Sequence, residues 1–560
     1  MSFPPALRAA RVFLIFGLAA DPAHGQGKAP TMAGRSTVYA PRAAIATSQP
    51  LATAAGLRVL QNGGNAVDAA VTAAAVLNVV EPHMTGIGGD MFAILWSAEE
   101  KRLVGLNASG RSGTLMNRAE LLKRGHRRVP VYGVEPITVP GALSGWAALL
   151  EKYGTITLAQ ALEPAIRIAE EGFPVTPIIA GQWAGQVELL QRDAGARATF
   201  LIDGARAPRP GEWFRNADLA ETFRRIAEKG PQELYGGDLG ARIVREVQGR
   251  GGYLMLGDLT HHRAEWVEPI SARYKGHTVW ELGPNTQGVA ALEMLRILEP
   301  IDLKAMGHNS AAYLHHLIEA KKLAYADLAR WIGDPQDMTA PVERLLDDGF
   351  IATRRKLLDP RRAAARAEPG EALTASETIY LAAADSAGNM ISFINSVYEY
   401  FGSGVVVPGT GFALQDRGAG FTLEEGLPNT VGPGKRPFHT IIPAFVTKPG
   451  PAGEEPWLAY GVMGGAVQPQ GHVQVLLNLL EFGMDLQEAI DAPRFRHLDG
   501  LRVGLEAPVS EPARAGLTNL GHQIVPLPPG SAGGAQAVMK LAKGWAAGSD
   551  PRKDGGALGW

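Results

Sequence analysis

Thr378-Ile-Tyr-Leu-Ala-Ala-Ala-Asp385, then Ser-Ala-Gly-Asn, then Met390-Ile-Ser-Phe-Ile-Asn-Ser396, is the stretch from which the fold can be predicted. Both flanking runs are short and mostly apolar, as in buried strands. The four residues between them include Gly388 and Asn389, which favour tight turns. We therefore expect a β-hairpin in the core. The residues before it, 368–376, are predicted to be exposed and flexible because they are rich in Glu, Pro and Gly.

Upstream of this hairpin, residues 62–78 predict a buried helix, because they are mostly small and apolar. Asn65 is its expected N-cap, and Glu81-Pro82 is expected to end it. Thr85-Gly-Ile-Gly-Gly-Asp90 then predicts a tight turn that leads into an apolar strand at Met91–Trp96.

The overall charge and the cysteine count exclude several functions. Lys and Arg number 54 against 56 Asp and Glu, a formal net charge of −2, so nothing supports binding to nucleic acid or to an anionic membrane. Cysteine is absent, which removes disulfides, thiol nucleophiles and thiolate zinc sites.

The N-terminal residues 1–31 allow two interpretations. Arg8 and Arg11 precede the apolar run Val12–Ala20, and Ala23-His-Gly25 resembles a cleavage site, so residues 1–25 outline a secretory signal that would place the protein in the periplasm. Alternatively these residues are an extension before a true start at Met32, and the protein is cytoplasmic. The apolar run is short for a membrane anchor, and no partnership with a membrane is expected.

Standard metal and nucleotide motifs are absent. There is no His-Glu-x-x-His, and the adjacent pairs His261-His262 and His315-His316 are expected on the solvated surface, so we predict neither a metal nor a cofactor. Three glycine pairs lie beside apolar runs: Gly88-Gly89, Gly464-Gly465 and Gly533-Gly534. Amides in such turns can stabilise an oxyanion, although each pair taken singly is more often only a turn.

Many segments together resemble the gamma-glutamyltransferase family of N-terminal-nucleophile hydrolases. They are Gly63-Gly-Asn-Ala-Val-Asp-Ala-Ala70, Glu81-Pro82, Gly86–Gly89, Val139-Pro-Gly-Ala142, Gly145-Trp146, Leu234-Tyr-Gly-Gly237, Glu319-Ala320, Ala324-Tyr-Ala-Asp327, Met463-Gly-Gly465, Asp491-Ala-Pro-Arg494 and Ser549-Asp-Pro-Arg-Lys-Asp-Gly555. The resemblance covers roughly residues 36–560 and preserves the order of the segments, which makes it far more specific than one motif.

This resemblance implies an α+β fold, a four-layer αββα sandwich, made from a precursor that cleaves itself between Glu377 and Thr378. The expected products are a large subunit, residues 32–377, and a small catalytic subunit, residues 378–560, paired as a heterodimer. Further pairing of heterodimers is left open.

The resemblance also implies the catalytic residues. Thr378 is the expected nucleophile, and its α-amine, free only after cleavage, is the expected base. Ser396 matches the position where the family uses a threonine to hydrogen-bond the nucleophile, and the amides of Gly464 and Gly465 are expected to bind the oxyanion.

The substrate-binding positions depart from those of the family's glutamyl enzymes. Ser109 stands at the position of the arginine, with Arg111 two residues on, and Tyr398 stands at the position of an asparagine. Gly420 replaces the acid that would bind an α-amino group, and Arg417 is gained nearby.

The family's Ser-Ser pair reads His439-Thr440 in this chain. Arg111, Tyr398, Arg417, His439 and Thr440 are therefore the expected substrate contacts, with arginine suited to a carboxylate. Residues 392–406 and 438–440 resemble the oxamate amidohydrolase branch of the family.

Four functions remain open at this point. The first is hydrolysis of a small carboxylate-bearing amide, oxamate-like, with water or an amine as acceptor. The others are a glutathione or gamma-glutamyl hydrolase and transferase, a glutaryl-cephalosporin-type acylase, and an unprocessed, non-catalytic binding protein.

Overall fold

The predicted hairpin is the centre of the structure, a computed structural model that describes residues 34–367, 377–451 and 453–560. Strands β10 (Glu377–Ala384) and β11 (Met390–Tyr398) pair antiparallel around the expected turn, which confirms the prediction. They lie in a seven-stranded sheet of order β19-β2-β10-β11-β3-β4-β7. Its other strands are β19 (Gly556–Gly559), β2 (Ala44–Thr47), β3 (Asp90–Ser97), β4 (Arg102–Ala108) and β7 (Glu265–Val267).

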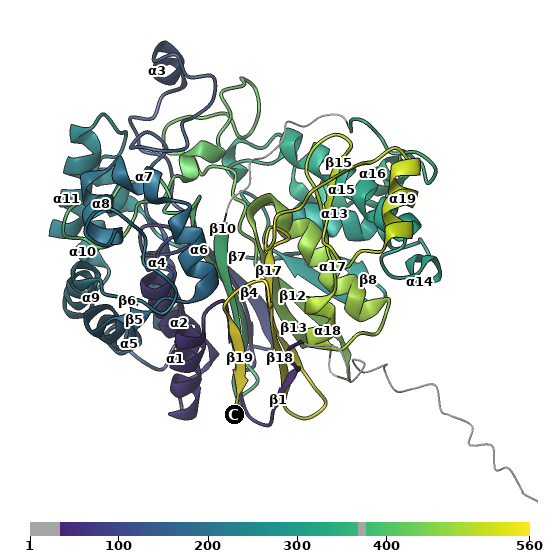
Figure 1. The fold of residues 1–560 in the computed structure, drawn as a ribbon, viewed down its shortest axis with the longest axis horizontal. Coiled ribbons are helices and arrows are strands. Elements are labelled where there is room, and N and C mark those ends of the chain that lie inside the picture. Colours follow the sequence, from purple (N-terminus) through teal and green to yellow (C-terminus); the bar gives the residue numbers. More distant parts are fainter. Residues whose placement is uncertain (1–33, 368–376, 452) are drawn as a thin grey trace, which may run out of the picture.

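A second seven-stranded sheet packs on the first, with the order β1-β18-β17-β13-β12-β9-β8. Its strands are β1 (Val38–Ala40), β18 (Trp545–Ser549), β17 (Gly534–Lys540), β13 (Gly453–Met463), β12 (Ala444–Gly450), β9 (His277–Glu281) and β8 (Ile270–Tyr274). Strand β10 contacts β13 and β17 across the interface between the sheets (Figure 1).

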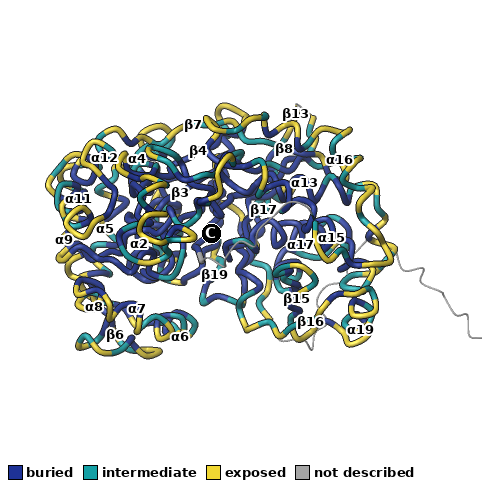
Figure 2. The backbone as a smooth tube through the Cα atoms, turned by 90° about the horizontal axis from the view of Figure 1, so that it is seen from above, coloured by how far each residue is buried: buried dark blue, intermediate teal, exposed yellow. Residues whose placement is uncertain are grey.

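Helices cover the outer face of each sheet. On one side lie α1 (Pro50–Gln61), α2 (Ala66–Val80), α4 (Ala142–Tyr153), α5 (Leu158–Glu171) and α9 (Ala217–Lys229). On the other lie α13 (Gly288–Leu298), α15 (Ala311–Trp331), α17 (Gln468–Leu480), α18 (Leu486–Asp491) and α19 (Glu511–Asn519). The expected four-layer αββα sandwich is confirmed. Figure 2 shows that its centre is buried and that exposed residues lie at its periphery.

The remaining elements lie around these layers. They are α3 (Arg118–Lys123), β5 (Phe173–Pro174), α6 (Pro177–Ala184), α7 (Val187–Gln191), α8 (Ala194–Phe200), β6 (Trp213–Phe214), α10 (Gln232–Tyr235), α11 (Asp238–Gly249), α12 (Leu256–His261), α14 (Leu303–Met306), η1 (Pro335–Asp337), η2 (Val342–Leu346), α16 (Asp348–Arg355), η3 (Arg417–Gly420), η4 (Gly465–Val467), β14 (Phe495–His497), β15 (Arg502–Leu505) and β16 (Gln523–Val525).

Helix α2 begins where the sequence predicts. The Asn65 side chain accepts hydrogen bonds from the Val67 and Asp68 amides at 2.9 and 3.0 Å, and Asp68 accepts one from the Asn65 amide at 2.8 Å. This capping box satisfies amides that would otherwise lack acceptors. All fifteen residues of α2 are buried, which explains why a helix of small side chains packs here.

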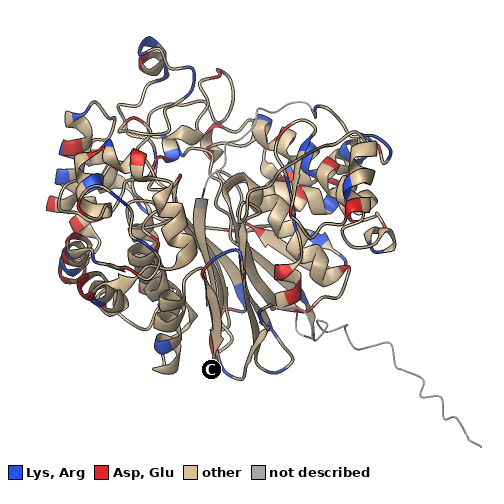
Figure 3. Ribbon diagram, viewed as in Figure 1, with Lys and Arg blue, Asp and Glu red and all other residues tan. Residues whose placement is uncertain are grey.

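Charged side chains lie mainly on the outer helices and loops, whereas the strands carry few of them (Figure 3). Within the described ranges, no helix is both long and apolar enough to cross a membrane. The predicted signal sequence lies outside those ranges, as does the segment that was expected to be flexible before the hairpin.

Gly88 and Gly89, which precede β3, allow the backbone at Ala413 and at Ser396 to approach them closely. A Cβ atom at Gly88 would lie 2.1 Å from the Ala413 carbonyl oxygen, and one at Gly89 would lie 2.1 Å from that of Ser396. No side chain fits at these distances, so this pair serves close packing beside the hairpin. The sequence left open whether Gly88-Gly89 binds an oxyanion or only forms a turn, and the structure supports the turn.

We predict that Gly89→Ala lowers the free energy of unfolding by about 1–3 kcal/mol, because the backbone of β11 must move away from the new methyl group. Gly181→Ala is the matched control: Gly181 lies in α6 with no neighbour within 4 Å of the added carbon. It should raise stability by up to about 1 kcal/mol, since alanine favours helix over glycine. Chemical denaturation of both variants tests this; equal stability of the two would contradict it.

Candidate active site

The hydroxyl groups of Thr378 and Ser396 meet at a bulge between β10 and β11. Ile379 pairs with Asn395, but Glu377 pairs with Tyr398, so two residues of β11 lie opposite Thr378 alone. Such a bulge redirects side chains locally. Thr378 Oγ1 donates a hydrogen bond to Ser396 Oγ at 3.2 Å, and both residues are fully buried.

Ser396 Oγ also accepts two other hydrogen bonds. The Tyr398 amide donates at 2.8 Å, and Arg417 Nη2 donates at 3.3 Å. Tyr398 has a φ of 85°, an unusual backbone conformation for a residue other than glycine. This strained position lies two residues from Ser396, and strain of this kind is typical of functional sites.

Arg417 is a fully buried cation at the start of η3. Its Nη1 donates to Thr440 Oγ1 at 2.9 Å, and its guanidinium lies 4.0 Å from the centre of the Tyr398 ring. Burial lowers the pKa of Arg417, but arginine stays charged in proteins. In the described part of the chain no carboxylate forms an ion pair with it, since its guanidinium donates only to hydroxyl oxygens, and its Nε has no hydrogen-bond acceptor.

Asp90 holds the segment that carries His439 and Thr440. Its Oδ1 accepts hydrogen bonds from the Gly110 amide at 2.8 Å, the Gly141 amide at 3.3 Å and Gln415 Nε2 at 3.0 Å. Its Oδ2 contacts His439 Nε2 at 3.1 Å.

Burial sets the protonation of this pair. It raises the pKa of Asp90 to about 7, and the Arg417 charge opposes that rise. Burial also lowers the pKa of His439 well below its ordinary value, which favours the neutral imidazole. The Ile441 amide donates to His439 Nδ1 at 3.4 Å, which leaves Nε2 to donate to Asp90. Asp90 and Gln415 were not among the predicted site residues, although Asp90 directly follows the glycine pair that opens an apolar strand.

The turn Gly464-Gly465 joins β13 to α17 and has free amides. Its φ angles are 130° and 60°, which favour glycine. The Val467 amide donates to the Gly464 carbonyl at 3.1 Å, and Gln287 Nε2 donates to the Gly465 carbonyl at 2.9 Å. Among the described residues, the amides of Gly464 and Gly465 donate to no acceptor. Gln287 Nε2 also contacts the Thr440 carbonyl and so connects this turn to the rest of the site.

Arg111 lies apart from these residues. Its Nη1 donates to Asp334 at 2.8 Å and to the Gly434 carbonyl at 3.2 Å, so its charge is already compensated. The structure thus joins Thr378, Ser396, Tyr398, Arg417 and Thr440 by direct contacts. His439 contacts Asp90, which is the strand partner of Ser396, and Gln287 connects Gly465 to Thr440. The side chain of Glu377 is not described.

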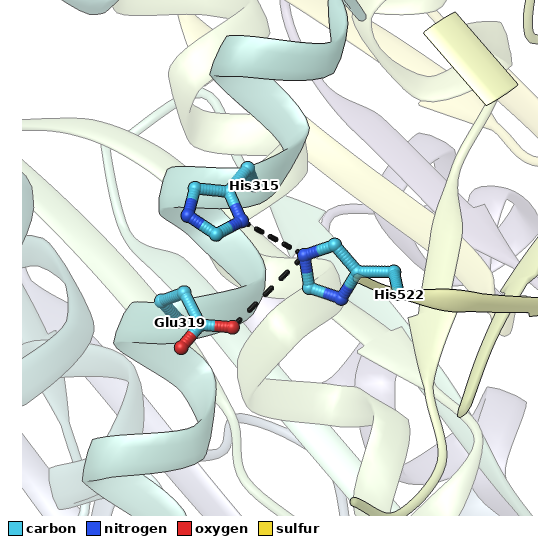
Figure 4. A group of neighbouring side chains, drawn as sticks. All are labelled: His315, Glu319 and His522. Atoms are coloured by element: carbon cyan, nitrogen blue, oxygen red, sulfur yellow. Dashed lines mark hydrogen bonds and ion pairs between the residues drawn. The ribbon is translucent and has the colours of Figure 1, made fainter. Parts of the chain in front are cut away.

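The expectation that the histidine pairs lie on the solvated surface is wrong for three of the four residues. His261 is exposed, but His262, His315 and His316 are buried because α12 and α15 pack against other elements. His315 and Glu319, one turn apart on α15, lie beside His522 (Figure 4). By residue type these three could hold a metal ion.

Hydrogen bonds already use the ligand atoms of this histidine cluster. His315 Nε2 contacts the Asp359 carbonyl at 2.8 Å and must donate to it, which leaves Nδ1 to accept from His522 Nε2 at 2.8 Å. Lys322 pairs with Glu319 at 2.7 Å. The cluster therefore ties α15 to the segment before β16 as it stands.

Comparisons with known proteins agree with the geometry. The family profile for gamma-glutamyltranspeptidase matches residues 52–560. The glutathione hydrolase-like YwrD proenzyme of Bacillus subtilis is 39% identical over 91% of this chain and 97% of its own. The oxamate amidohydrolase proenzyme of Klebsiella pneumoniae is 35% identical over the same shares, 91% and 97%.

A solved structure is similar over nearly the whole chain. The crystal structure of cephalosporin acylase from Bacillus halodurans superposes with a TM-score of 0.89 at 42% identity, covering 95% of this chain and 98% of that one. The matched family profile and these relatives show that the chain belongs to the gamma-glutamyltranspeptidase family of N-terminal-nucleophile amidohydrolases and acyltransferases.

Proposed function

We propose that this protein is a self-processing threonine amidohydrolase that acts on amides of a small, carboxylate-bearing acyl group. One observation carries the proposal: the Thr378 hydroxyl and an unpaired buried cation, Arg417, contact the same Ser396 oxygen. A nucleophile and an anion-binding group thereby converge on one point. The homology to proenzymes adds support.

Processing would convert Thr378 from a strand residue into the catalyst. The Thr378 oxygen attacks the Glu377 carbonyl carbon, the peptide C–N bond breaks, and an ester joins the two residues. Water then hydrolyses this ester and leaves a Glu377 carboxylate and a free Thr378 α-amine. The boundary divides the chain into residues 32–377 and 378–560.

The free amine supplies the base that the precursor lacks. An α-amine has a pKa of about 7.7–8.0, so near neutral pH a fraction is unprotonated and accepts the proton of its own hydroxyl. Thr378 Oγ1 then attacks the substrate amide carbon and forms an acyl-enzyme. The amides of Gly464 and Gly465 stabilise the oxyanion. Water resolves the acyl-enzyme, or an amine does so in transfer.

Arg417 is the proposed partner of the substrate carboxylate. Burying a guanidinium without a carboxylate partner costs free energy, and a ligand that supplies the carboxylate would offset that cost. The two parallel N–H groups of an arginine match the two oxygens of a carboxylate. The ring of Tyr398 holds the guanidinium from one face, and Thr440 holds it at its edge. His439, fixed by Asp90, keeps Thr440 in place.

The site fits a glutamyl substrate less well, because such a substrate also carries an α-ammonium group that needs an anionic partner. Gly420 offers no carboxylate, and a Cβ there would lie 2.8 Å from the Phe438 carbonyl oxygen. Asp416 is buried with its Oδ2 unpartnered, which is the observation that favours this alternative. Burial, however, raises the pKa of Asp416 well above its ordinary value, which disfavours the carboxylate form that an ammonium group would need.

A substrate panel separates these functions. Oxamate, a glutaryl amide and a gamma-glutamyl anilide would be compared by kcat/KM. Preference for either of the first two supports the proposal. Preference for the gamma-glutamyl anilide supports a glutathione-type enzyme instead.

We predict that Thr378→Ala remains one full-length chain and loses at least about 10³-fold in activity, because both the cleaving hydroxyl and the nucleophile are gone. Intact-mass analysis under denaturing conditions and an amidase assay measure the two effects. Thr378→Ser keeps a hydroxyl and is the control, expected to be cleaved at the same bond. Cleavage of the alanine variant before residue 378 would remove Thr378 from the mechanism.

We predict that Arg417→Lys lowers kcat/KM for the carboxylate-bearing amide by roughly 10²-fold, mainly through KM, because an ammonium group cannot form the two-pronged contact. Arg502→Lys, an exposed arginine paired with Asp499, is the control and should keep wild-type kinetics. An unchanged KM in the Arg417 variant would place the carboxylate elsewhere.

A further inference from the structure

The oxyanion turn of the proposed mechanism is held from behind by a side chain on α15. The Tyr325 hydroxyl donates a hydrogen bond to the carbonyl of Ala466, the residue after Gly465. Gln470 Nε2 reaches the same carbonyl at 3.5 Å. Tyr325 lies upstream of the cleavage boundary and the turn lies downstream of it, so this contact would join the two subunits.

Through two peptide units, the Tyr325 hydrogen bond affects the orientation of an amide that is proposed to bind the oxyanion. In a trans peptide the carbonyl and the next amide point in opposite directions, so holding one orients the other. Tyr325 holds the Ala466 carbonyl and thereby orients the Val467 amide. That amide donates to the Gly464 carbonyl at 3.1 Å, which in turn orients the Gly465 amide. The Gly465 amide is one of the two free donors of the turn.

Tyr325 is itself fixed in place. Lys321 Nζ lies 3.9 Å from the centre of its ring and also contacts His497 Nδ1 at 3.0 Å. The His497 amide donates to Gln470 Oε1 at 2.9 Å, which closes a ring of contacts from α15 through β14 back to α17. The turn is flexible by composition, with two glycines at positive φ, so rigidity has to come from such neighbours.

We propose that Tyr325 is a positioning residue that aims the Gly465 amide at the oxyanion, across the boundary between the two subunits. This inference rests on the proposed function. Tyr325 touches no reacting atom, and it acts only through the Ala466, Val467 and Gly464 backbone. Oxyanion donors act mainly in the transition state, so loss of the hydroxyl should affect kcat and leave substrate binding intact.

The test is Tyr325→Phe, which removes one oxygen and keeps the ring. Tyr313→Phe, a buried tyrosine elsewhere on α15, is the matched control. We expect kcat of the Tyr325 variant to fall roughly 10- to 100-fold while KM stays within about 3-fold of wild type. The control should keep wild-type kinetics, and both variants should give two chains by intact mass.

A pair of inhibitors separates positioning from a general structural defect. Carboxyethylboronic acid forms a tetrahedral adduct with the nucleophile, whereas succinate has the same shape and cannot. We expect the Tyr325 variant to lose boronate affinity in proportion to kcat and to bind succinate as wild type does. Unchanged kcat, or equal losses for both inhibitors, would overturn the inference. A wild-type enzyme inactive on every carboxylate-bearing amide would instead overturn the proposed function and the inference with it.

Discussion

The hydrogen bond between Thr378 and Ser396 is the constraint around which the rest of the structure is arranged. It exists because β10 and β11 lose register by one residue at the end of the central hairpin. Both strands lie in the middle of their sheet, flanked by β2 and β3 and covered by α2. The hydroxyl of the proposed nucleophile is thereby held on buried backbone in the middle of a sheet, and only its local strand end departs from regular pairing.

Buried charge is the second constraint. Arg417 has no ion pair with a carboxylate in the described ranges, although burying a cation without one is unfavourable. The neighbouring carboxyl groups relieve this cost only in part. Asp90, Asp416 and Glu399 oppose the fall in the pKa of Arg417, but Asp90 is engaged with three donors and His439, and burial raises the pKa of Asp416 well above its ordinary value. This unpaired cation is the reason why the proposed substrate carries a carboxylate.

Segments from both sides of the proposed cleavage boundary build the two sheets. Each sheet contains strands from before and from after residue 378, so neither segment could complete a sheet alone. Both sides also meet at the turn of Gly464 and Gly465. There Gln287 and Tyr325, from upstream segments, donate hydrogen bonds to the carbonyls of Gly465 and Ala466. Cutting the chain would free one strand end while leaving the contacts of the sandwich in place.

The sequence alone determined the hairpin, the capped helix α2 and the family, because local propensity, turn residues and ordered motifs carry that information directly. Through the resemblance it also predicted Thr378, Ser396 and the glycine turn as site residues, and these roles remain predictions. It failed at Asp90, Gln287, Tyr325 and the buried histidines, whose importance depends on partners more than 100 residues away. Of the two candidate arginines in the described ranges, only the tertiary structure decided that Arg111 forms an ion pair and that Arg417 does not, since compensation of a charge depends on neighbours that folding brings together.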